Sequence, residues 1–209
     1  MLYHSGHIFL IARRAHERSK NDDSEAMPAI VLSTVALECF VNETIHRVSN
    51  GYGREPVEVY SKATDWLDFI ESKRSSTLEK IEALHLAFKS TKINRGAQPY
   101  QNLMLLYQLR NELVHRKPEG FGNWDPSDHD REYKPHKFVS ALASEGVIDL
   151  PPPKAPPVWG QFVLKEKTAK WAFNTAVSGV HFIVNLLPDP ESDFAQITNL
   201  MVDTLEKID

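Results

Sequence analysis

Several features are scarce in this sequence, and each shortage excludes a class of protein. The chain has one cysteine, Cys39, so no disulfide can form within it, which favours a reducing compartment. No apolar run approaches the roughly eighteen residues of a membrane span, and the N-terminus lacks the apolar core of a signal peptide. The formal net charge of -4 is not the basic excess of a protein that coats nucleic acid. We therefore expect a soluble protein of the cytoplasm that does not contact a membrane.

Metal and cofactor motifs are missing as well. The nine histidines include His129 and His136 in an Asp-rich loop, but none stands in a pattern such as H-E-x-x-H. The chain also lacks a Walker motif, a G-x-G-x-x-G loop and a G-x-S-x-G elbow. We predict neither a metal site nor a cofactor.

Helical periodicity, in contrast, runs through most of the chain, and no segment alternates as a strand would. Ser76 or Thr77, ahead of Glu79, provides capping chemistry for one helix, and Pro118 ends another. The segment AIVLSTVALECFV is apolar on nearly every side, which is typical of a central buried helix. The pattern predicts an all-α fold with a short C-terminal helix after the main ones, which we expect at about 8–19, 28–49, 56–72, 75–90, 99–117 and 165–187.

Residues 118–163 differ in character from the rest of the chain. They include GFGNWDPSDHD and LPPPKAPPVW, which are rich in Pro, Asp and Gly, and they allow only a short helix near 135–145. So few aliphatic side chains cannot build a separate core. We predict one domain, 1–209, in which 118–163 forms an irregular insertion or flap before the penultimate helix.

The stretch LYQLRNELVH places a cation, Arg110, among leucines. Glu38 lies in an apolar stripe of the second helix, so the two charges could form a buried ion pair with each other. Losing one partner of such a pair costs on the order of 3–5 kcal/mol. This is a purely structural interpretation of Arg110. It assumes that Arg110 occupies the centre of the buried face, because five apolar residues lie within about 60° of it on a helix: Leu103, Leu106, Tyr107, Leu113 and Val114.

Other polar residues follow Arg110 at the end of the same helix. His115 lies about 140° around the helix from Arg110 and one turn after Asn111, which places it at the edge of the apolar face. Arg116 and Lys117 add positive charge beside it. A helix that serves only as a scaffold has no need for this cluster at its end, so the combination favours a functional site.

The motif R-N-E-L-V-H, from Arg110 to His115, resembles the R-x-x-x-x-H signature of the HEPN superfamily, including a polar residue after the arginine. The segment VALECFVNETI resembles the helix of that group that carries a glutamate and an asparagine. The resemblance implies an up-and-down helical bundle that forms a homodimer, in which the two motif helices meet along a cleft. Many members are metal-independent endoribonucleases, often toxins or defence effectors, and others have lost catalysis.

Site residues are carried over from the resemblance as follows. The implied substrate is RNA, and a neutralising antitoxin or a defence-system protein is an implied partner. Histidine can take the proton of the 2′-hydroxyl near neutral pH, and arginine can stabilise the charge that builds on the phosphate, which yields a 2′,3′-cyclic phosphate. The implied catalytic residues are Arg110, His115 and Asn111, with Glu38 and Asn42 in support and Arg116 and Lys117 binding substrate.

Two other interpretations remain open from the sequence. One is a HEPN-like module that binds RNA or dimerises but has no activity. The other is a helical scaffold in which Glu38 and Arg110 form only a core ion pair.

Overall fold

The computed structural model describes residues 4–49, 58–115, 137–150 and 159–187, together with 205, 207 and 208. Within these ranges the chain forms helices and no strand, which confirms the all-α prediction. The elements are α1 (His4–Ser19), the short 3-10 helix η1 (Asp23–Glu25), α2 (Ala26–Ser49), α3 (Glu58–Ser72), α4 (Thr77–Lys89), α5 (Tyr100–His115), α6 (Lys137–Ser144), α7 (Gly160–Val163) and α8 (Glu166–Val184).

The first helix begins earlier than the sequence pattern predicts, at His4 rather than Ile8. The reason lies on α2, where the Glu43 carboxylate accepts hydrogen bonds from the backbone N–H groups of His4 and Ser5 and from the Ser5 hydroxyl, at 2.9, 3.2 and 2.6 Å. A negative charge at a helix N-terminus satisfies unpaired N–H groups and complements the helix dipole. The cap comes from another helix, so the sequence around His4 does not reveal it.

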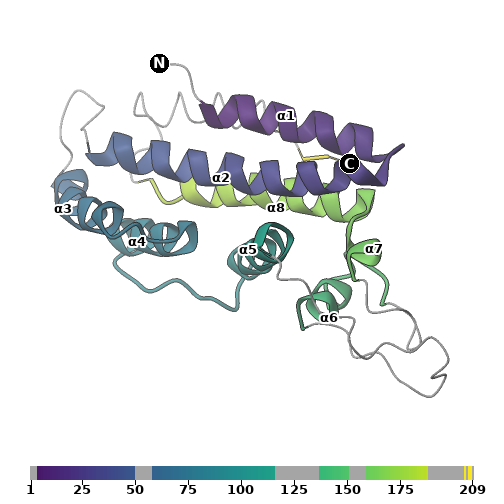
Figure 1. The fold of residues 1–209 in the computed structure, drawn as a ribbon. Coiled ribbons are helices and arrows are strands. Elements are labelled where there is room, and N and C mark those ends of the chain that lie inside the picture. The colour runs from purple at the N-terminus through teal and green to yellow at the C-terminus, as the bar shows by residue number, and fades with distance from the viewer. Residues whose placement is uncertain are drawn as a thin grey trace.

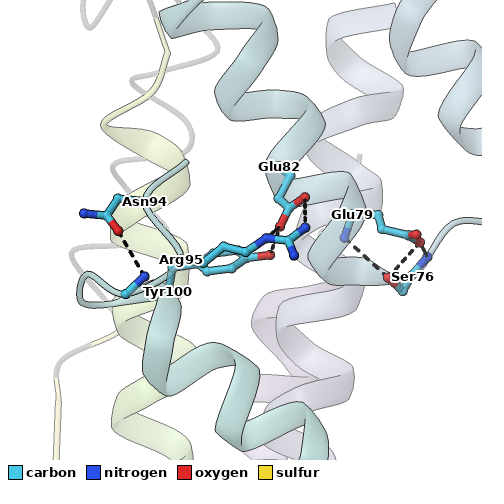
Figure 2. Close-up of polar contacts among 7 residues, drawn as sticks. Ser76, Glu79, Glu82, Asn94, Arg95 and Tyr100 are labelled. Atoms are coloured by element: carbon cyan, nitrogen blue, oxygen red, sulfur yellow. Dashed lines mark hydrogen bonds and ion pairs between the residues drawn. The ribbon is translucent and has the colours of Figure 1, made fainter. Parts of the chain in front are cut away.

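The start of α4 follows from local sequence alone. Ser76 is the N-cap, and its side chain accepts from the Glu79 backbone N–H while the Glu79 carboxylate accepts from the Ser76 backbone N–H (Figure 2). This capping box confirms one of the two predicted caps. The helix ends at Lys89, and its C-cap, Ser90, adopts the left-handed conformation with a φ of 56°.

The core is organised around α2. Figure 1 shows α1, α2 and α8 alongside one another, with α3 and α4 near one end of α2, while α5 is viewed almost along its axis and so runs across them. The Phe9 ring of α1 meets the Phe173 ring of α8 edge to face, with centroids 6.0 Å apart. Twelve residues of α2 are buried, which confirms its predicted central position.

This central helix also corrects one expectation. Together with η1 it forms a helical segment, Asp23–Ser49, of 27 residues that is long and apolar enough to cross a membrane by length and composition. The expectation that no segment reaches this length was therefore wrong. Half of its most apolar window is buried inside the protein, and α2 contacts α1, α3, α4, α5 and α8. A core helix that is covered on most sides passes the same test of composition.

A glycine allows three helices to approach closely. A Cβ atom added to Gly179 of α8 would stand 3.0 Å from a methyl carbon of Leu37 on α2 and 3.0 Å from one of Leu103 on α5. Distances this short are tighter than nine in ten Cβ contacts, so the missing side chain lets α5 pack closely against α2 and α8. The position of α5 matters because this helix carries the R-N-E-L-V-H motif.

Part of the predicted insertion contributes to the core. The predicted short helix near 135–145 is confirmed as α6, and its Phe138 ring packs edge to face on Trp159, with centroids 4.7 Å apart. Buried residues of α6 and α7 belong to the same apolar cluster as those of the long helices. Residues 118–136 and 151–158 lie outside the described residues, as does the predicted C-terminal helix apart from 205, 207 and 208.

Candidate functional site

The register of α5 differs from the prediction. Its five buried residues point on average towards Leu106, about 45° from Arg110, whose side chain is partly exposed. The prediction that Arg110 occupies the centre of the buried face was therefore wrong. The periodicity of one helix does not show how many neighbours cover it, and α5 contacts α2, α6 and α8.

The predicted ion pair between Glu38 and Arg110 is also absent from this structure. The two residues form no ion pair with each other, and neither is fully buried. Arg110 instead donates a hydrogen bond from Nη1 to Oδ1 of its neighbour Asn111, at 3.1 Å. Because both charges reach water, neither needs the other as a partner, and the guanidinium keeps most of its donors for other contacts.

Tyr107 lies near both Glu38 and Arg110. Burial raises the pKa of the Tyr107 hydroxyl, the Glu38 carboxylate raises it further, and Thr77 and the Arg110 guanidinium oppose the shift. Thr77 is near the hydroxyl, but the contact lacks hydrogen-bond geometry, so the buried oxygen has no partner among the described residues. Glu38 and Arg110 thus both lie close enough to the Tyr107 hydroxyl to affect its pKa, although they form no direct pair.

Asn42, the second supporting residue predicted on α2, is engaged elsewhere. Its Oδ1 accepts a hydrogen bond of 2.8 Å from Nζ of Lys80 on α4, and Lys80 also forms an ion pair of 2.6 Å with Glu71 on α3. Lys80 is only 8% exposed, so this three-helix contact supplies the partners that a nearly buried ammonium needs. Sequence reasoning missed Lys80, although its place between Thr77 and Ile81 on an apolar face gave a signal.

The first turn of α5 is held by a second polar cluster, which Figure 2 shows. Arg95, in the loop after α4, donates to both carboxylate oxygens of Glu82, at 2.8 and 3.0 Å, and the Tyr100 hydroxyl donates to the same carboxylate at 2.5 Å. Burial alone would raise the pKa of Glu82, but the hydrogen bonds from Arg95 and Tyr100 outweigh burial and lower that pKa. The cluster fixes the position of the first turn of α5, and the motif follows on the same helix.

The remaining motif residues lie on the surface. Asn111 and His115 are exposed, His115 is the last residue of α5, and Val114 between them is 44% exposed. Arg110 and His115 are separated by about 7.5 Å along the helix axis. The predicted substrate-binding residues Arg116 and Lys117 lie outside the described residues. The structure thus places Arg110, Asn111 and His115 on one accessible stretch of α5.

Potential metal ligands are dispersed in the part of the chain that the structure describes. There, no three His, Cys, Asp or Glu side chains stand close enough together to hold a metal ion. The loop that contains His129 and His136 lies outside the described residues.

Comparison with known proteins adds no relative. No protein-family model, no curated protein and no solved structure matches this chain. The likeness to the HEPN superfamily consequently depends on the R-N-E-L-V-H motif and on the helix that bears Glu38.

Proposed function

We propose that this protein is a metal-independent endoribonuclease of the HEPN type, which acts as a homodimer on RNA. The observation that carries the proposal is the surface at the end of α5. An arc of about 140° runs from Arg110 through Val114 and Asn111 to His115, and each of these four side chains is at least partly exposed.

Arg110 has the properties that a phosphate-binding residue requires. Guanidinium stays charged at any physiological pH and matches the oxygens of a phosphate with a planar set of donors. In this chain it is not neutralised by Glu38, and its described hydrogen bond is to a neutral amide, Asn111. A scaffold in which Arg110 only completes a core ion pair is therefore the weakest of the three interpretations.

His115 is suited to move the proton in the same reaction. An exposed imidazole can take the proton from a 2′-hydroxyl, after which the 2′-oxygen bonds to phosphorus and the bond to the 5′-oxygen breaks. The imidazolium can then give its proton to the departing 5′-oxygen. The products are a 2′,3′-cyclic phosphate and a free 5′-hydroxyl, so DNA, which lacks the 2′-hydroxyl, should resist cleavage.

The same geometry supports a dimer. Since Arg110 and His115 point about 140° apart, one copy of α5 cannot direct both side chains at a single phosphate. Two copies related by a two-fold axis could place the arginine of one opposite the histidine of the other, and would cover the exposed Val114 between them. Pairing would also double the local positive charge on a chain with a formal net charge of -4.

Cleavage of labelled single-stranded RNA in excess EDTA tests the proposal. Wild type should cut RNA but not DNA of the same sequence, and leave cyclic phosphate ends. Removal of a general base or of a charge-stabilising donor typically lowers a rate by about 100-fold or more, so His115→Ala and Arg110→Ala should each lose at least that much activity. His7→Ala and Arg14→Ala, at exposed positions of α1, are the matched controls and should cut like wild type.

Other outcomes separate the alternatives. Folded protein that binds RNA but cuts no member of a broad RNA panel would identify an inactive binding module. The engagement of Asn42 with Lys80 is the observation that favours this second candidate, because it occupies one of the residues expected to support catalysis. If the protein is an active nuclease of the cytoplasm, a neutralising antitoxin or a defence partner would be needed to protect the RNA of the cell.

A further inference from the structure

The hydroxyl group of Tyr107 is a buried polar group that the proposed reaction does not use. Its oxygen has no hydrogen-bond partner among the described residues, although Thr77 of α4 and Glu38 of α2 lie near it. A hydroxyl buried in this way has given up its hydrogen bonds to water without replacement. Such groups are rare in folded proteins, so this one requires an explanation.

The other tyrosine of α5 shows how a buried hydroxyl is ordinarily satisfied. Tyr100 donates to the Glu82 carboxylate at 2.5 Å, as Figure 2 shows. Burial raises the pKa of both tyrosine hydroxyls, and in each case a nearby glutamate raises it further. Tyr107 therefore has the same kind of acidic neighbour as Tyr100 but lacks the hydrogen bond to it.

That acidic neighbour, Glu38, is a carboxylate without a donor. It is partly exposed, and it forms no hydrogen bond or ion pair with another described residue. A glutamate side chain has several rotatable bonds, so at a partly exposed position it can turn without any movement of the backbone. Tyr107 offers a donor without an acceptor, and Glu38 offers an acceptor without a donor. A hydrogen bond between them would satisfy both groups.

The same carboxylate could instead pair with Arg110. This arginine follows Tyr107 by three residues on α5 and lies about 60° from it around the helix. In the structure it donates to Asn111 and forms no ion pair with Glu38. Such a pair would occupy the guanidinium donors and neutralise the charge that a phosphate requires. The donor that holds Glu38 thus determines whether Arg110 is available to a substrate.

We propose that Tyr107 is a positioning residue, whose hydroxyl donates a hydrogen bond to the Glu38 carboxylate and thereby keeps it from pairing with Arg110. This inference rests on the proposed function, because it concerns how Arg110 binds the phosphate of RNA. It provides an acceptor for the buried hydroxyl, and it gives a reason why an acid lies near the guanidinium without neutralising it. Tyr107 acts through Glu38 and does not touch the substrate itself.

The affinity for an RNA strand that cannot be cleaved tests this role. The probe is a fluorescein-labelled single-stranded RNA of random sequence in which methoxy groups replace all the 2′-hydroxyls, and fluorescence anisotropy at fixed ionic strength measures its binding. Tyr107→Phe removes only the hydroxyl, which frees Glu38 to pair with Arg110, and it should weaken binding by about tenfold. Tyr107→Phe/Glu38→Gln should restore the affinity to within about twofold of wild type.

Two control variants are matched to these changes. Tyr100→Phe removes the other hydroxyl of α5 and should bind the probe like wild type, even where its melting temperature falls. Glu112 lies about 160° around α5 from Arg110. Tyr107→Phe/Glu112→Gln therefore removes one negative charge without releasing Arg110, and it should stay about tenfold weaker than wild type. Melting curves from circular dichroism show that each variant is folded.

Glu38→Gln alone provides a test at a partly exposed position, where the fold is not at risk. It should bind the probe within about twofold of wild type, because the carboxylate that it removes does not contact the guanidinium. A rise of about tenfold would show that Glu38 and Arg110 are already paired in wild type, which would overturn the proposal.

Three other results would also overturn the role of Tyr107: a Tyr107→Phe variant that binds like wild type, a loss that Glu38→Gln does not restore, or a loss that Glu112→Gln restores equally well. Failure of the proposed function gives a different result. Wild type that binds the probe but does not cleave unmodified RNA is not a nuclease, and the comparison of variants still decides the role of Tyr107. Wild type that does not bind the probe at all would overturn both proposals.

Discussion

The stability of an Arg110→Ala variant separates a structural arginine from one that is available to a ligand. If Arg110 were half of a buried ion pair, its removal would cost on the order of 3–5 kcal/mol. In the structure it is partly exposed, forms no ion pair with Glu38, and donates to the exposed Asn111. Interactions between exposed polar groups contribute about 0–1 kcal/mol, so we expect a loss below about 1 kcal/mol in the free energy of unfolding.

Urea unfolding followed by helical circular dichroism gives this free energy for wild type, Arg110→Ala, Glu38→Ala and the double variant. The coupling between the two positions in this cycle should be less than about 0.5 kcal/mol, which is the limit within which independent sites add. Lys80→Ala provides the contrast, because it removes a nearly buried ammonium and leaves the Asn42 oxygen without its donor, at a cost of about 1–3 kcal/mol. Protein concentration must be equal throughout, since dimerisation would add to apparent stability.

A loss of 3 kcal/mol or more for Arg110→Ala, with strong coupling to Glu38, would refute this reasoning. It would show that the ion pair forms in solution and that Arg110 belongs to the core. The scaffold interpretation would then be favoured over the other two. A small loss together with a large fall in RNA cleavage would assign Arg110 to function instead.

Two further predictions concern packing and pH. Gly179→Ala should lower the melting temperature, because the new Cβ crowds the methyl groups of two leucines at a cost of about 1–3 kcal/mol. This cost exceeds the gain in helix propensity of about 1 kcal/mol. An unchanged or raised melting temperature would contradict the packing of α5. Burial, followed by the charges of nearby carboxylates, raises the pKa of the Cys39 thiol to about 11. At pH 8 this thiol should react with a thiol-specific reagent on the order of a hundredfold more slowly than a free thiol. The protonated thiol should contribute its full stability below the ordinary thiol pKa, and this contribution should decline as the pH rises towards 11. A rate at pH 8 equal to that of free cysteine would exclude this shift.

Local chemistry made much of the fold predictable. Ser76 and Glu79 specify the start of α4 within four residues of sequence, and the run of apolar residues around Leu37 identifies α2 as the central helix. The start of α1 could not be predicted in this way, because its cap is Glu43, thirty-eight residues away from Ser5 in the sequence. Helix ends that depend on tertiary contacts escape rules that consider only neighbours in the chain.

The residues of the candidate site could be named from the sequence, but their contacts could not. Periodicity placed Arg110 among leucines, yet it could not show that the buried face is centred on Leu106 rather than on Arg110, since that depends on the helices that cover α5.

The polar side chains of α2 differ in what they are free to do, and this bears on the proposed reaction. Glu43 caps α1, and Asn42 binds Lys80, so both have structural roles that a substrate would have to disrupt. Glu38 forms no hydrogen bond or ion pair with another described residue, although it lies close enough to the Tyr107 hydroxyl to affect its pKa. If α2 contributes a carboxylate to RNA cleavage, Glu38 is therefore the residue that can do so without loss of a helix cap or a buried lysine's partner. Glu38 and Arg110 both affect the pKa of Tyr107, so the carboxylate lies near the guanidinium without contacting it. The guanidinium charge is therefore available to a phosphate.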